Sequence, residues 1–145
     1  MYPSRLDDKG RLKLPVAFQQ YFLGLRDKKL FVTSLDGRTA QVYPMAVWRT
    51  NEKFFENYRD DVELARNVFF NAADLGSESE MDSQGRILFS PELRRELGIE
   101  NQSVKLYAYR GHIEIITEET YQERRNSARQ TDQTGLSKLE AAGLN

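Results

Sequence analysis

The stretch DDKGRLKLP, from Asp7 to Pro15, has a counterpart in DSQGRILFS, from Asp82 to Ser90. Both stretches begin with Asp-x-x-Gly-Arg, continue with apolar residues at every second position, and lead into a run typical of a helix. An internal repeat of this kind decides the fold, because both copies must adopt the same local structure. The repeat therefore predicts two similar units within one chain of 145 residues.

The match extends beyond the motif when Asp7 is aligned with Asp82. Apolar positions then coincide in three pairs, and we predict that all six side chains are buried in one shared core: Leu12 with Ile87, Leu14 with Phe89, and Phe18 with Leu93. Each copy goes on to a β-rich segment, a turn at Gly37 or Gly111, and a second β-rich segment. These hairpins are KLFVTSLDGRTAQVYP (Lys29 to Pro44), which is one residue longer after its glycine, and SVKLYAYRGHIEIIT (Ser103 to Thr117). The repeated unit is therefore a turn, a strand, a helix and a hairpin.

The Asp-x-x-Gly-Arg motif has the composition of a tight turn. Asp7 and Asp82 can accept hydrogen bonds from the backbone N–H groups that follow them. Gly10 and Gly85 can adopt the positive φ angle that many tight turns require. We interpret all four residues as stabilising the turn or orienting the arginine. A catalytic role for the two aspartates is less favoured, because carboxylates that alternate with lysine are common in turns.

The strand after each turn has one apolar face and one outward face. In the first copy, Arg11 and Lys13 lie opposite the leucines and form a basic edge. In the second copy, Arg86 shares the outward face with Leu88, so this edge is less basic. Lys9 adds one more cation in the first turn. On residue chemistry alone, these cations could form a solvated strand face or a nucleic-acid contact.

Helices follow both strands and also fill the segment between the copies. Serine caps a helix start well and proline is tolerated in the first turn, so a helix begins at Ser90-Pro91. Gly24 and Gly98 end the helices of the two copies. Apolar residues at near-helical spacing from Met45 to Phe70 predict two more helices, broken near Arg59 to Asp61.

These elements predict an α+β fold made of two pseudo-symmetric units with short helices. The predicted domains are a first repeat at 1–48, a helical linker at 49–73, a second repeat at 74–121, and a flexible polar tail at 122–145. The formal charge is +4 over residues 1–45 and −5 over residues 46–85. The basic charge therefore lies with the first repeat, and the acidic charge lies between the repeats.

The composition excludes several classes of chemistry. With 39% hydrophobic and 30% charged residues, the chain has the balance of a globular protein in water. It contains no cysteine and one histidine, so thiolate chemistry and multi-histidine or cysteine metal sites are excluded. No apolar run approaches the roughly 18 residues that a membrane helix needs, and the first residues form no hydrophobic signal segment. We therefore expect a cytoplasmic protein without a metal, a cofactor or a membrane partner.

A few other residues could have a functional role, but a structural role is favoured for each. His112 falls at the tip of the second hairpin, where we expect a surface turn residue rather than a ligand or base. Trp48, Phe54 and Phe55 could stack on the bases of a single strand. Their spacing is helical, however, so we predict that they belong to the core.

The two motifs and the segments around them resemble the MraZ family. The matching features are the paired motifs with their helices, the segment RNVFFNAADLGSESEMDSQGR (66–86), and the hairpin LDGRTAQVYP (35–44) with its shorter second counterpart. The resemblance covers about residues 5 to 121. It implies two AbrB/SpoVT-like swapped-hairpin barrel units. From the resemblance we expect a shortened N-terminus, since family members begin several residues earlier. The chain also has a serine at Ser90 where proline is common in the family, and a longer tail.

The resemblance also implies a function. The family comprises DNA-binding regulators of the bacterial division and cell-wall gene cluster, so we expect a repressor rather than an enzyme. We expect it to bind short direct repeats of double-stranded DNA upstream of its own operon, as a ring-shaped homo-oligomer at the nucleoid. By the motif match, Arg11 and Arg86 contact DNA, and Lys13 and Lys9 are further candidates.

Two other classes of function stay open at this point. The same barrel could form an oligomeric scaffold or an antitoxin-like protein-interaction module that does not bind DNA. A hydrolase could use the turn carboxylates, but no apolar pocket pattern surrounds them. These carboxylates are Asp7, Asp8, Asp60, Asp61 and Asp82. Salt-dependent binding to random duplex DNA distinguishes a DNA-binding protein from both alternatives.

Overall fold

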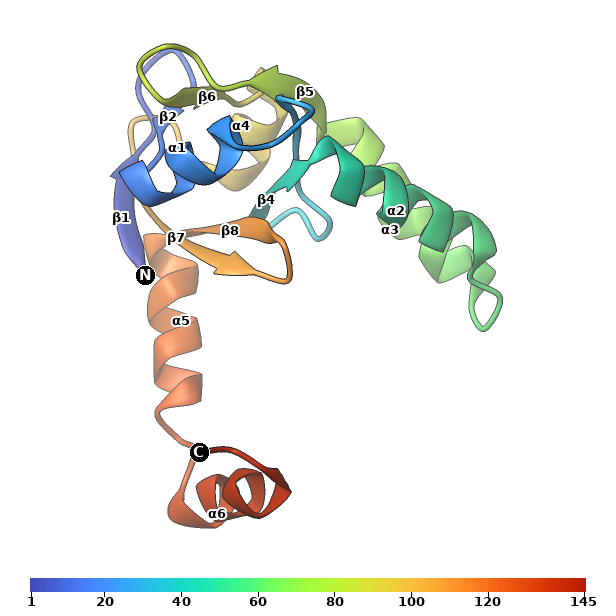
Figure 1. The fold of residues 1–145 in the computed structure, drawn as a ribbon, viewed down its shortest axis with the longest axis vertical. Coiled ribbons are helices and arrows are strands. Elements are labelled where there is room, and N and C mark those ends of the chain that lie inside the picture. Colours follow the sequence, from blue (N-terminus) through green and yellow to red (C-terminus); the bar gives the residue numbers. More distant parts are fainter.

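The computed structural model describes residues 1–145 and has the predicted α+β architecture (Figure 1). The strands are β1 (Tyr2–Arg5), β2 (Arg11–Lys13), β3 (Lys29–Thr33), β4 (Ala40–Pro44), β5 (Ser77–Glu80), β6 (Arg86–Leu88), β7 (Ser103–Tyr109) and β8 (His112–Thr117). The helices are α1 (Val16–Leu23), α2 (Met45–Asn57), α3 (Val62–Leu75), α4 (Pro91–Leu97), α5 (Glu118–Ala128) and α6 (Gln133–Ala142). The order strand, strand, helix, hairpin, helix occurs twice, from β1 to α2 and from β5 to α5.

The strands of the two copies are interleaved. Six strands form one antiparallel sheet in the order β1-β7-β8-β4-β3-β5, and β2 pairs with β6 in a second, two-stranded sheet. The hairpins β3–β4 and β7–β8 meet at the centre of the large sheet through β4 and β8. At the edges, β1 of the first copy pairs with β7 of the second, and β5 of the second copy pairs with β3 of the first. Each copy thus supplies the edge strand for the other copy's hairpin.

The main hydrophobic core includes residues from both sheets. Burial of the repeat's apolar residues is confirmed at five positions: Leu12, Leu14, Ile87, Phe89 and Leu93. The prediction is wrong for Phe18, which is only partly buried. Helix α1 lies at the margin of the core, where the ring of Phe18 meets the half-exposed ring of Tyr2 at 5.2 Å between centroids.

Helices α2 and α3 form a hairpin that projects away from the sheet (Figure 1). The predicted break is confirmed, because α2 ends at Asn57 and α3 begins at Val62. Asp61 caps α3 by accepting a hydrogen bond from the backbone N–H of Leu64 at 3.0 Å.

The aromatic residues of α2 are not all core residues. Trp48 is buried against Tyr43, as predicted, and Phe55 is partly buried against the same cluster. Phe54 is 58% exposed, so its predicted place in the core is wrong. The outer turns of α2 extend beyond the sheet (Figure 1), so only the inner turns have a sheet to pack on.

His112 is not a surface turn residue, contrary to the prediction. Arg110 and Gly111 both have positive φ angles and form the turn, so His112 is the first residue of β8. Its imidazole lies 4.6 Å from the ring of Tyr43 between centroids, and its Nε2 lies 2.9 Å from Oε1 of Glu114. Only 10% of its side chain is exposed.

The C-terminal residues form α5, which extends away from the sheet, and then α6 (Figure 1). Thr117 and Asp132 cap the starts of these helices with their side chains. Neither helix has a buried residue. The predicted flexibility of residues 122–145 stays a prediction. None of the helices is both long enough and apolar enough to cross a membrane.

The packing predicts that both copies are needed for stability. Leu14→Ala and Phe89→Ala each remove a side chain that is at most 1% exposed, so each should lower the free energy of unfolding by about 2–5 kcal/mol. Leu88→Ala is the matched control, because Leu88 is 53% exposed, and it should change stability by less than about 0.5 kcal/mol. Denaturant titration measures all three variants. Unchanged midpoints for Leu14→Ala and Phe89→Ala would contradict this packing.

Candidate nucleic-acid interface

Asp7 organises the first turn through both its side chain and its backbone. Its Oδ1 accepts hydrogen bonds from the backbone N–H of Lys9 at 2.9 Å and of Arg11 at 2.8 Å. Its own backbone N–H donates to the carbonyl of Arg11 at 2.9 Å. Gly10 closes the loop with a φ angle of 82°, which residues with a Cβ rarely adopt. The predicted turn role of Asp7 and Gly10 thus has a direct geometric basis.

The second turn has the same geometry. Oδ1 of Asp82 accepts hydrogen bonds from the backbone N–H groups of Gln84 and Arg86, both at 2.9 Å. The backbone N–H of Asp82 donates to the carbonyl of Arg86 at 2.9 Å, and Gly85 has a φ angle of 77°. The repeated sequence therefore encodes a repeated backbone conformation.

Each aspartate also orients the arginine of its motif. Nε of Arg11 donates to Oδ2 of Asp7 at 2.8 Å, and Nε of Arg86 donates to Oδ2 of Asp82 at 2.8 Å. The side chains of Arg11 and Arg86 are 32% and 24% exposed. A guanidinium has five N–H donors, and the four on the Nη atoms make no hydrogen bond in this structure. Both arginines are thus fixed in orientation and can still bind an external acceptor.

The pairing of β2 with β6 brings the two turns together. Lys13 lies opposite Arg86 and Arg11 lies opposite Leu88 in the antiparallel register. The sheet is extended by backbone hydrogen bonds from Leu14 to Gly85 at 2.9 Å and from Phe89 to Gly10 at 2.8 Å. Figure 1 shows β2 and β6 at the end of the molecule opposite α5 and α6. The predicted site residues are therefore gathered on one edge.

The two lysines of the first copy lie on the same edge. Both are exposed, Lys9 within the turn and Lys13 at the end of β2. Nζ of Lys13 donates to the carbonyl of Gln84, so this side chain links the end of β2 to the second turn. With the two arginines, they form a basic edge of four cations, which we call the turn edge. Four cations of a chain with a net charge of −1 thus lie on one edge, and Asp7 and Asp82 pair with two of them.

The turn geometry lowers the pKa of both motif aspartates. For Asp7, the hydrogen bond from the backbone N–H of Arg11 is the main cause, and the guanidinium of Arg11 adds to it. The backbone N–H and the guanidinium of Arg86 lower the pKa of Asp82 in the same way. Both carboxylates are therefore ionised at neutral pH, which favours the orienting role over that of a proton donor.

Two residues next to the turn edge were not identified from the sequence. Arg94, on α4, lies so close to Gly10 that a Cβ at this glycine would overlap its guanidinium. Gln19, on α1, occupies the corresponding position against Gly85. The alignment contained a signal, because the offset that places Asp7 on Asp82 also places Gln19 on Arg94. No group of three or more His, Cys, Asp or Glu residues is arranged to bind a metal.

The lowered pKa values predict that stability depends on pH. A carboxylate whose pKa is lowered in the folded state stabilises the fold at pH values above its ordinary pKa of 3.8. This contribution is lost as the pH falls through the folded-state pKa. We expect the Asp7→Asn, Asp82→Asn double variant to lose part of the acid sensitivity of the wild type. Denaturant titrations over a pH series measure the free energy of unfolding of each variant. Asp8→Asn, at an exposed neighbour, is the control, and identical profiles for wild type and double variant would contradict the assignment.

No protein-family model matches the chain. Curated relatives named transcriptional regulator MraZ do match it. The protein from Acidobacterium capsulatum is 30% identical over 123 residues, which cover 84% of this chain and 83% of the relative. The protein from Burkholderia cenocepacia is 30% identical over 124 residues, 85% of this chain and 84% of the relative. A third, from Koribacter versatilis, is 35% identical over 97 residues, 66% of this chain and 65% of the relative.

The first two relatives match over more than four fifths of the chain. Similarity of this extent also covers most of each relative, so it is not limited to one shared motif. The family suggested by the repeated motif is thereby confirmed. The chain belongs to the MraZ family.

Proposed function

We propose that this chain is a DNA-binding transcriptional regulator rather than an enzyme, and that the turn edge is its DNA interface. The observation behind the proposal is the pair of arginines that Asp7 and Asp82 orient on one edge while their Nη donors stay free. The relatives' name, transcriptional regulator, supports the same role. A protein with this role would act in the cytoplasm, at the nucleoid.

The turn edge has the chemistry to bind both parts of a DNA duplex. A guanidinium can donate two parallel hydrogen bonds to a phosphate or to the O6 and N7 acceptors of guanine. Because Asp7 and Asp82 fix the orientation of Arg11 and Arg86, less entropy is lost on binding. Lys9 and Lys13 are more exposed, and an ammonium group is a point charge without the planar donor fork of arginine, so they are assigned to phosphates. In this arrangement the lysines contribute affinity and the arginines contribute specificity.

The fold proposed for the two copies is the swapped-hairpin barrel of AbrB and SpoVT. The exchange of edge strands supports it, since β1 pairs with β7 and β5 pairs with β3. The same element order in each copy is a second support. The proposed division is unchanged: repeats at 1–48 and 74–121, a helical linker at 49–73, and a C-terminal tail at 122–145.

The proposed target is a set of direct repeats upstream of the protein's own division and cell-wall operon, where binding represses transcription. One subunit has only four cations on the turn edge, so a single contact with DNA is weak. Tethering several subunits in a ring raises the effective concentration and can increase affinity by roughly 10² to 10⁴ when the DNA repeats match the subunit spacing. The ring and the repeats therefore form one mechanism.

The end of the α2–α3 hairpin is one surface that supports self-association. Between Phe54 and Leu64 it has four acidic residues and one arginine, and it exposes several apolar side chains. The acidic residues are Glu56, Asp60, Asp61 and Glu63, and the exposed apolar residues are Phe54, Val62 and Leu64. We call this surface the acidic tip.

A groove beside α5 has complementary chemistry. It is lined by tyrosines and arginines, among them Tyr107, Tyr109, Tyr121, Arg124, Arg125 and Arg129. The α2–α3 hairpin and helix α5 project in different directions (Figure 1), so we assign the acidic tip of one subunit to the groove of a second copy. The two surfaces differ, so the contact is heterologous, and repeated contacts of this type close into a ring if the rotation permits.

An oligomeric scaffold or antitoxin-like module is the second candidate function. The exposed apolar side chains of the α2–α3 hairpin favour it, above all Phe70, which is 69% exposed. This function does not require DNA. The Asp-oriented arginines have no role in it, so the variants below distinguish the two candidates.

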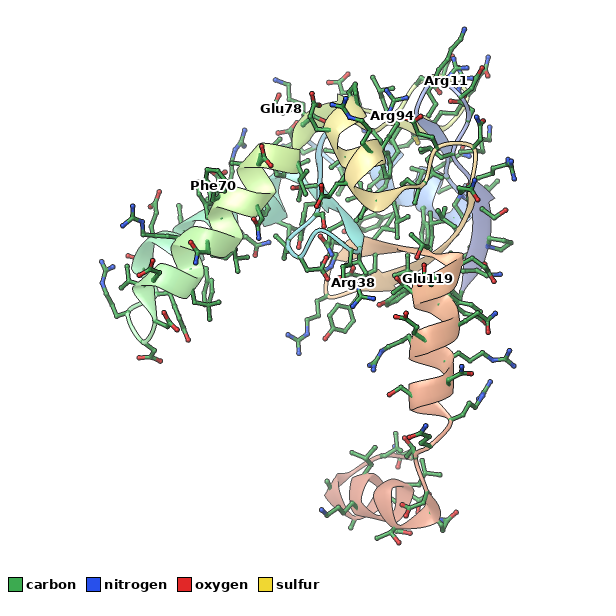
Figure 2. The ribbon with its side chains drawn as sticks, turned by 180° about the vertical axis from the view of Figure 1, so that it is seen from behind. Arg11, Arg38, Phe70, Glu78, Arg94 and Glu119 are labelled. Carbon is green, nitrogen blue, oxygen red and sulfur yellow. The ribbon has the colours of Figure 1, made fainter.

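Removing the arginines should weaken DNA binding without changing the fold. We expect Arg11→Ala to cost about 1–3 kcal/mol in binding and Arg86→Ala to cost less, because the second turn has Gln84 where the first turn has Lys9. Arg38→Ala removes the same charge from a 66% exposed side chain far from the turn edge (Figure 2) and is the control. Gel shifts on promoter and scrambled duplexes at several salt concentrations measure these effects. If the Arg11→Ala, Arg86→Ala double variant binds the promoter as tightly as wild type, these two residues do not carry DNA binding.

Charge reversal tests the ring. We expect the Asp60→Lys, Asp61→Lys variant and the Arg124→Glu, Arg125→Glu variant each to have a lower mass than wild type, because each repels its partner surface. Mixing the two variants should restore association, because the reversed tip then meets the reversed groove. Light scattering after gel filtration measures the mass, with Arg11→Ala as the control. A wild-type mass of 16.9 kDa at micromolar concentration contradicts the ring, and unchanged masses in both variants contradict these surfaces.

A further inference from the structure

The glycines of the two turns are covered by different side chains. Arg94, from α4 of the second copy, covers Gly10 of the first copy's turn. Gln19, from α1 of the first copy, covers Gly85 of the second copy's turn. Each helix therefore supports the turn of the other copy. Figure 2 shows Arg94 at the same end of the molecule as Arg11.

Gln19 shows what this position requires for packing. It follows Asp7 by twelve residues, as Arg94 follows Asp82, so the two side chains are equivalent in the repeat. Nε2 of Gln19 donates to the carbonyl of Leu14 at 2.7 Å, which satisfies the amide within the protein. A neutral glutamine is thus sufficient to cover a turn glycine.

Arg94 differs from Gln19 because one of its buried N–H donors has no hydrogen-bond acceptor in the protein. Its Nε is buried and has no hydrogen-bond partner. The carboxylate of Glu100 is 3.9 Å from this Nε, which is too far for a hydrogen bond. Only 14% of the Arg94 side chain is exposed, so its charge has lost most of its hydration without gaining full compensation. Packing alone does not explain this arginine, since glutamine does the same work in the other copy.

One other difference between the two turns also adds positive charge at the first turn. Lys9 in the first turn corresponds to Gln84 in the second. Lys9 and Arg94 both lie at the first turn, whereas Lys13 lies opposite Arg86 and its Nζ donates to the carbonyl of Gln84 in the second turn. An anionic ligand would therefore bind more strongly at the first turn than at the second.

We propose that Arg94 is a third arginine of the DNA interface and binds a backbone phosphate that lies against the first turn. The proposal rests on the DNA-binding function proposed above. Gly10 has no side chain, so the guanidinium lies directly beside the turn backbone. A phosphate oxygen there would accept a charge-assisted hydrogen bond from an Nη atom of the guanidinium and balance its charge, while the buried Nε stays out of its reach. The contact is independent of base sequence, because every nucleotide offers the same phosphate.

The chain itself provides the substitutions that test this contact. Arg94→Gln introduces the side chain that the equivalent position already uses, so the turn should keep its packing. With full-length protein and a random-sequence duplex, we expect affinity at fixed low salt to fall about three- to tenfold. The slope of log affinity against log salt should become shallower by about 0.9, the value for one phosphate. Gln19→Arg should have the opposite effect on both quantities, and circular dichroism and melting temperature should stay unchanged in both variants.

Further variants separate a phosphate contact from a structural role. Arg94→Lys retains the charge and should keep the wild-type salt slope. If Arg94→Gln binds with wild-type affinity and slope while the wild type shows salt-dependent binding, this inference is overturned and the proposed function is not. If the wild type shows no salt-dependent binding, both are overturned. If Arg94→Gln unfolds, the other two variants decide the question. The inference is then overturned if Gln19→Arg keeps the wild-type salt slope and Arg94→Lys has a reduced slope.

Discussion

The antiparallel pairing of β2 with β6 is the contact on which both the fold and the candidate interface depend. It places Leu12 opposite Ile87, and both side chains are fully buried in the main core. Since neighbouring strand residues point to opposite faces, the same pairing directs Arg11 and Arg86 away from that core. A shift of the register by one residue would exchange the two faces, so burial of the apolar side chains also fixes the position of the arginines.

The two copies share a backbone but differ in their surfaces. Both turns need an aspartate that accepts two backbone hydrogen bonds and a glycine with positive φ, and both have them with nearly the same distances. No such requirement applies to the exposed positions, and there the copies diverge, as with Lys13 and its counterpart Leu88. A duplicated fold can therefore have an unequal charge distribution. This inequality supports the proposed DNA interface, because a turn repeated only for stability would not need it.

Much of the fold and of the site could be predicted from local patterns. The turn residues, the alternation in β2 and the break between α2 and α3 depend on neighbours in the sequence, and the structure agrees with all of them. Phe54 and His112 were predicted wrongly because their burial depends on distant elements. The outer turns of α2 extend beyond the sheet, which exposes Phe54, whereas Tyr43 from β4 packs against the ring of His112. Periodicity describes a helix or strand and does not describe what lies beside it.

The two turns follow from local sequence alone, because Asp7 and Asp82 bond to groups within four residues of themselves. The apolar strand face also follows from local sequence, because alternation is a property of consecutive residues. The exchange of edge strands between the copies, and the covering of Gly10 by Arg94 and of Gly85 by Gln19, arise only from three-dimensional packing. These contacts join residues from different copies of the repeat, and many sequences that satisfy the local rules could pair in other ways. Their outcome depends on the shared core, where the apolar side chains of both copies can be buried only together.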